Sequence, residues 1–172
     1  MSIQDWGSIG ELVAAIATVL TLVYLSYQIR ANTRSTQTES RLNITTEYRH
    51  GLDELMDPQV WTAWVNGLHN YPDIPFEQRG AFQSLMSKEG LFFQGVFAQF
   101  ENGQLEQETY EAYLLWFGSL ISTPGGAYIW NESLRPVFVP KMVKVVDERL
   151  LRGELVNVLE QAQYQLPVPT KR

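Results

Sequence analysis

The chain lacks cysteine altogether, which excludes disulfide bonds, thiolate metal sites and cysteine nucleophiles. Basic residues are absent from the first 29 positions, where Asp5 and Glu11 are the only charged side chains. The other 143 residues carry 13 basic and 17 acidic groups, a balance of -4. An acidic surface repels nucleic acid, so we expect no nucleic-acid partner.

The segment from Leu12 to Ile29 is 18 residues without a charge. As a helix it covers roughly 27 Å, close to the hydrocarbon thickness of a bilayer. Tyr24, Tyr27 and Trp6 stand near its two ends, where membrane proteins concentrate aromatic side chains. The sequence therefore predicts a transmembrane helix with the lipid bilayer as its first partner.

Two other interpretations of this segment stay open. A signal peptide requires a basic start and a cleavage site of small residues, whereas this start is acidic and the run ends in Gln28-Ile29-Arg30. A buried helix of a soluble domain fits the polar residues within the run, but its length favours a membrane. Basic residues follow the span and none precedes it, which places the N-terminus outside and the rest of the chain in the cytoplasm.

Polar and small side chains form one stripe along the predicted span. With Leu25 they recur at alternating steps of three and four, the spacing of a single helix face; the polar and small members of this stripe are Glu11, Ala14, Thr18, Thr21 and Gln28. Such residues mark packed faces of membrane helices, so we expect a neighbour, either a second copy or another membrane protein. The alternative is that the threonines bond back to their own helix.

After the span, the pattern predicts helices throughout. No glycine or proline interrupts residues 11 to 50, so the first helix is expected to continue. Its later turns carry apolar residues that resemble a core face: Leu42, Ile44, Tyr48, Leu52, Leu55 and Met56. The following helices are expected from Pro58 to near Gly67, from near Phe76 to a stop at Asn102-Gly103, and over 107 to 122, 142 to 151 and 154 to 163, with a short segment at 128 to 134. No run alternates at period two, so the expected fold class is all-α: a transmembrane helix and a cytoplasmic helical bundle.

Candidate chemistry is sparse. Glu47 and His50 have the Glu-x-x-His spacing of half a di-metal site, but a full site needs a second copy, so no metal or cofactor is expected. Glu89 begins the most apolar stretch of the chain, and burial there would raise its pKa and suit it to acid or base work. Its neighbour Lys88 suggests the simpler alternative of a solvated face.

A group of aromatic residues is the second candidate site. Together with Glu89, these residues predict a pocket for an apolar ligand: Trp61, Trp64, Phe93 and Trp116. Trp130 is a further aromatic candidate for its wall. Aromatic residues at helical spacing are more often plain core, which is the competing interpretation.

The stretch "LVYLSYQIRANTRSTQTES" resembles an uncharacterised bacterial family of small single-pass membrane proteins, in which an apolar helix exits in a YLxxQIRxNT-like motif. The resemblance extends to "GGAYIWNESLRPVFVPKMVKVVDERL" near the other end. It implies a bacterial inner-membrane location and carries over no functional residue.

These observations predict three parts, namely a tail and span at 1 to 30, a bundle at 31 to 165 and a tail at 166 to 172. The expected function is that of a non-enzymatic oligomeric or accessory subunit at the inner membrane. A membrane-tethered sensor for an apolar ligand, or a small homo-oligomeric pore, are the alternatives, and an enzyme acting through Glu89 ranks behind them.

Overall fold

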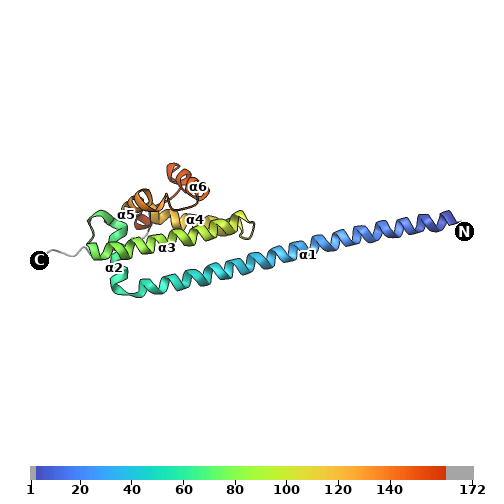
Figure 1. Ribbon diagram of the computed structural model, residues 1–172, viewed down its shortest axis with the longest axis horizontal. Coiled ribbons are helices and arrows are strands. Elements are labelled where there is room, and N and C mark those ends of the chain that lie inside the picture. Colours follow the sequence, from blue (N-terminus) through green and yellow to red (C-terminus); the bar gives the residue numbers. More distant parts are fainter. Residues whose placement is uncertain (1–2, 162–172) are drawn as a thin grey trace. The chain divides into compact units, whose positions relative to one another are not determined.

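A computed structural model of the chain describes residues 3 to 161, and every regular element among them is helical, which confirms the all-α fold class (Figure 1). The elements follow one another in this order: α1 (Ile3–Asp53), η1 (Glu54–Met56), α2 (Pro58–Asn70), η2 (Tyr71–Asp73), α3 (Phe76–Glu101), α4 (Gln107–Ile121), α5 (Pro124–Ile129), η3 (Trp130–Leu134), α6 (Pro140–Leu151) and α7 (Val158–Gln161).

Helix α1 is 51 residues long and continues without a break past the apolar run, as the absence of helix breakers predicts. Among the described residues, α1 is the one helix that is long and apolar enough to cross a membrane. None of the side chains in its most apolar 18-residue stretch is buried.

The chain divides into an N-terminal unit, Met1–Ser40, and a C-terminal unit, Arg41–Arg172. The predicted boundary at residue 30 marks the end of the apolar run, whereas the two units of the structure divide between Ser40 and Arg41. Arg41 pairs there with Glu106 at 3.3 Å, and Ile44 is buried. The predicted boundary at 165 lies outside the described residues.

The last turns of α1 match the predicted core face only in part. Ile44 is buried, and Tyr48 and Leu55 are partly buried. The prediction is wrong for Leu42 and Met56, which are 64% and 82% exposed, because no other helix among residues 3 to 161 covers those positions. The side chain of Leu52 lies outside the described set.

Helix α2 begins as predicted but extends past its predicted end. The carboxylate of Asp57 accepts hydrogen bonds from the backbone N–H groups of Gln59 and Val60, at 2.7 and 3.2 Å, as an N-cap does. Gly67 does not end the helix, which reaches Asn70. Its role is packing, since a Cβ there would lie 2.2 Å from the ring of Phe82 in α3.

Helix α3 contributes much of the core of the C-terminal unit and contacts α2, α4 and α5. It begins and ends as predicted, and Gly103 follows with φ at 71°, a conformation that favours glycine. The core it shares with α4, α5, η3 and α6 is rich in aromatic side chains; its largest fully buried members include Phe82, Phe93, Phe117 and Trp130.

The segment after α4 is more regular than the sequence predicts. Thr123 is fully buried and caps α5, since its Oγ1 accepts from the N–H of Gly126 at 3.0 Å and donates to the carbonyl of Leu120 at 2.8 Å. The stretch "STPGG" thus both ends one helix and starts the next. One π-helical turn, η3, then places the buried Trp130, whose Nε1 donates to Asp147 of α6 at 3.1 Å.

The predicted final helix is much shorter in the structure. It begins at Val158 rather than Glu154, after Gly153 with φ at 67°, and its predicted end at 163 lies outside the described residues.

Candidate functional site

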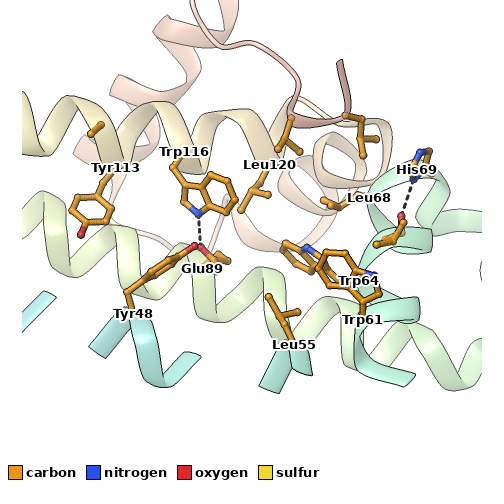
Figure 2. Close-up of a pocket in the computed structure, with 14 residues that line it drawn as sticks. Tyr48, Leu55, Trp61, Trp64, Leu68, His69, Glu89, Tyr113, Trp116 and Leu120 are labelled. Atoms are coloured by element: carbon orange, nitrogen blue, oxygen red, sulfur yellow. Dashed lines mark hydrogen bonds between the residues drawn. The ribbon is translucent and has the colours of Figure 1, made fainter. Parts of the chain in front are cut away.

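A cavity of about 590 Å³ opens in the C-terminal unit (Figure 2). Side chains from α1, η1, α2, α3, α4 and α7 converge on it; the lining residues are Tyr48, Leu55, Trp61, Trp64, Val65, Leu68, His69, Glu89, Ala112, Tyr113, Trp116, Leu120, Val158 and Leu159. Its volume falls in the range of small-molecule sites, and its lining combines apolar walls with a few polar groups.

Four of the residues predicted for a ligand pocket line this cavity: Trp61, Trp64, Glu89 and Trp116. The further candidate Trp130 lies in the core instead, 1% exposed. The prediction is wrong for Phe93, which lies in the core, 1% exposed. Its ring stacks on Phe117 of α4, with centroids 5.1 Å apart and an interplanar angle of 15°, so its apolar surface is already covered.

Glu89 is the polar centre of the cavity. Its Oε2 accepts a hydrogen bond of 3.2 Å from Nε1 of Trp116, and Figure 2 shows the hydroxyl end of Tyr48 directed toward the same carboxyl. Its sequence neighbour Lys88 binds both carboxylate oxygens of Glu54 instead. Burial raises the pKa of Glu89 to about 7, and the Trp116 hydrogen bond offsets part of that rise.

Two tyrosines that the sequence analysis did not assign to a site lie at this end of the cavity. Tyr48 and Tyr113 both contact the ring of Phe92, with centroid distances of 5.1 and 5.5 Å. Burial, followed by the nearby Glu89 carboxyl, raises the pKa of Tyr48, so its hydroxyl stays protonated. Tyr113 and Trp116 are three residues apart on α4, a spacing that places both on one helix face.

His69 lines another part of the cavity, and its Nδ1 lies 2.9 Å from the backbone carbonyl of Val65, one turn earlier in α2. The side chain is otherwise exposed. This contact lies within α2 and links His69 to no other part of the cavity wall.

The pKa of Glu89 gives a test of the site through protein stability. A carboxyl with a higher pKa in the folded protein than in the unfolded chain makes folding take up a proton between the two values. Stability is therefore expected to fall as the pH rises from about 4.5 to 7, by at most about 3 kcal/mol, and to change little through this group above that window. Glu89→Gln should remove this component, measured as chemical denaturation of both proteins at pH 4.5 and pH 8; equal losses in the two proteins would contradict the assignment.

The predicted stripe on α1 is exposed along its whole length, but its two threonines and its glutamine have hydrogen-bond partners on the same helix. The hydroxyls of Thr18 and Thr21 donate to the carbonyls of Ala14 and Ala17, each at 2.8 Å. The amide of Gln28 donates to the hydroxyl of Tyr24 at 2.7 Å. These bonds reduce the need for a neighbouring helix, so assembly through Glu11, Ala14, Thr18, Thr21 and Gln28 stays a prediction.

Because each threonine hydroxyl is already bonded within α1, we expect the double variant Thr18→Leu and Thr21→Leu to have the same particle mass as the natural chain in lipid nanodiscs. Native mass spectrometry of the two proteins at matched concentration measures this. A lower mass for the variant would instead show that the stripe holds copies together.

The sequence-predicted metal spacing gains no support. Among the side chains that the structure describes, no group of three or more histidines, aspartates or glutamates gathers in a way that suits a metal ion. Glu47 is exposed, and the side chain of His50 lies outside the described set.

Comparison of the chain with families of known sequence, with curated proteins and with solved structures finds no match.

Proposed function

We propose that the chain is a single-pass, membrane-anchored binding protein that senses an apolar small molecule in the cavity of its C-terminal unit, without catalysing a reaction. The observation that carries the proposal is the cavity itself, about 590 Å³ with three tryptophans and one carboxyl in its wall. Trp61 and Trp116 remain 43% and 39% exposed, although burying large aromatic side chains is favourable. An apolar ligand would cover them.

The anchor in this proposal is the uncharged segment of α1. It is long and apolar enough to cross a bilayer, and its side chains are open to contact lipid. The arginines that follow it favour a cytoplasmic C-terminal unit at a bacterial inner membrane. The internal hydrogen bonds of the stripe make ligand binding, rather than assembly or a pore, the better supported role.

The absence of cysteine allows a direct test of this topology. Single substitutions Ser8→Cys and Gln83→Cys place one thiol on either side of the segment from Leu12 to Ile29. We expect a membrane-impermeant maleimide to label Ser8→Cys in intact spheroplasts, and Gln83→Cys only after permeabilisation. The reverse pattern, or recovery of the protein in the soluble fraction after carbonate extraction, would contradict the anchor.

The ligand-binding role is tested with the full chain in maltoside micelles and a neutral apolar probe, neopentylbenzene. A ligand that binds only the folded state raises the unfolding temperature with its concentration. We expect a saturable rise, followed by near-ultraviolet circular dichroism, which reports the packing of the aromatic core. A change that is linear in probe concentration, or no change, would contradict the proposal.

A further inference from the structure

The wall of the cavity is unusually rich in π-electron faces. Trp61 and Trp64 come from α2, Trp116 and Tyr113 from α4, and Tyr48 from α1 (Figure 2). Indole and phenol rings attract a cation placed over their faces, and the attraction is stronger where water is excluded. The aromatic walls can therefore bind a cation as well as a neutral hydrocarbon.

The charged groups of the lining also favour a cationic ligand. Glu89 contributes a carboxyl, and none of the described lining residues is a lysine or arginine. The adjacent Lys88 is held by Glu54, so it does not neutralise Glu89. Trp116 donates one hydrogen bond to one carboxylate oxygen. A partly buried carboxylate of this kind is stabilised by a cation that enters the cavity.

We propose that the ligand of this cavity is a lipophilic organic cation, an amine or quaternary ammonium carrying apolar groups. Its positive centre lies beside Glu89, and its apolar groups lie against the indoles. This inference rests on the proposed function, because it names the chemical class that the same cavity binds.

Binding of such a cation is coupled to the protonation of Glu89. The groups around this carboxyl are the Tyr48 hydroxyl from α1 and the side chains of Trp116 and Tyr113 from α4. The neighbouring Lys88 on α3 is paired with Glu54 of η1. His69 of α2 lines a different part of the cavity wall. Because a bound cation favours the carboxylate, it lowers the pKa of Glu89 and releases a proton. Affinity should thus rise as the pH passes from 6 to 8.

The experiment compares benzyltrimethylammonium with neopentylbenzene, its neutral carbon isostere, on the full chain in maltoside micelles. We expect Glu89→Gln to weaken binding of the cation at pH 8 by roughly tenfold and to weaken binding of the neutral probe much less, since a carboxylate close to a cation in a partly buried site contributes on this scale. In the natural chain, the cation should bind more weakly at pH 6.

A second variant keeps the test valid if Glu89→Gln is unstable. Trp61→Leu removes one π face at a partly exposed position but keeps an apolar side chain there, and it should weaken binding of the cation more than binding of the neutral probe. If both variants affect the two probes equally, the cation assignment is wrong and the apolar-ligand function stands. If neither probe binds the natural chain, both the assignment and the proposed function fail.

Discussion

Gly125→Ala is expected to destabilise the C-terminal unit by about 3 kcal/mol or more, because the added methyl has no space. A Cβ at this position would lie 1.7 Å from the carbonyl oxygen of Gly67, which is backbone and does not move aside as a flexible side chain would. The two glycines allow α5 and α2 to approach closely, and α2 supplies Trp61 and Trp64 to the cavity. The clash should therefore reduce ligand binding as well as stability.

Thermal unfolding followed by near-ultraviolet circular dichroism measures the effect, with an expected fall of about 10 °C in the unfolding temperature for a unit of this size. The matched control is Gly95→Ala in α3, where an added Cβ meets no atom within 4 Å. Alanine at an open helical position stabilises by about 0.5–1 kcal/mol relative to glycine. Equal behaviour of the two variants would show that α2 and α5 do not pack as described.

Ala112→Phe is expected to abolish most of the probe binding without harming the fold. Ala112 lines the cavity from α4 but is exposed, so a larger side chain there fills the binding volume without displacing core atoms. We expect the affinity for neopentylbenzene to fall by roughly tenfold or more, about 1.4 kcal/mol, at an unchanged unfolding temperature in the absence of probe.

The same substitution outside the cavity controls for the added surface. Ala98 is exposed on α3 and is not among the lining residues. Ala98→Phe should leave probe binding at the level of the natural chain. If Ala112→Phe binds the probe as well as Ala98→Phe does, the probe occupies the micelle or another surface, and the cavity is not the site.

Local signals in the sequence were sufficient for the helices that have clear caps. Asp57-Pro58 marks the start of α2, and Asn102-Gly103 marks the end of α3, because capping and left-handed backbone are properties of a few adjacent residues. The prediction that α2 ends near Gly67 was wrong, because this glycine does not end the helix. Its lack of a side chain makes room for Phe82, and that requirement is visible only when α3 is in place.

The candidate site was also predictable only in part from the sequence. Glu89 lies in a strongly aromatic helix, where burial raises the pKa of a carboxyl, and the chain has only five tryptophans, so the sequence alone indicates these residues as candidates. The sequence did not predict that Tyr48 lines the same cavity as Glu89 and the tryptophans, since this depends on how the last turns of α1 pack against α3 and α4. Phe93 fails for a related reason: its position on α3 allows either the core or the cavity, and stacking on Phe117 decides for the core.

The most direct test of the account is fluorine NMR of the full chain labelled with 5-fluorotryptophan, titrated with neopentylbenzene. The chain has five tryptophans, and single Trp→Phe variants assign their signals. Three of them line the cavity, whereas Trp130 is buried in the core and Trp6 precedes the apolar segment. We predict saturable shifts for Trp61, Trp64 and Trp116 with Trp130 and Trp6 unchanged; shifts confined to Trp6, or spread equally over all five, would contradict a ligand site in the C-terminal unit.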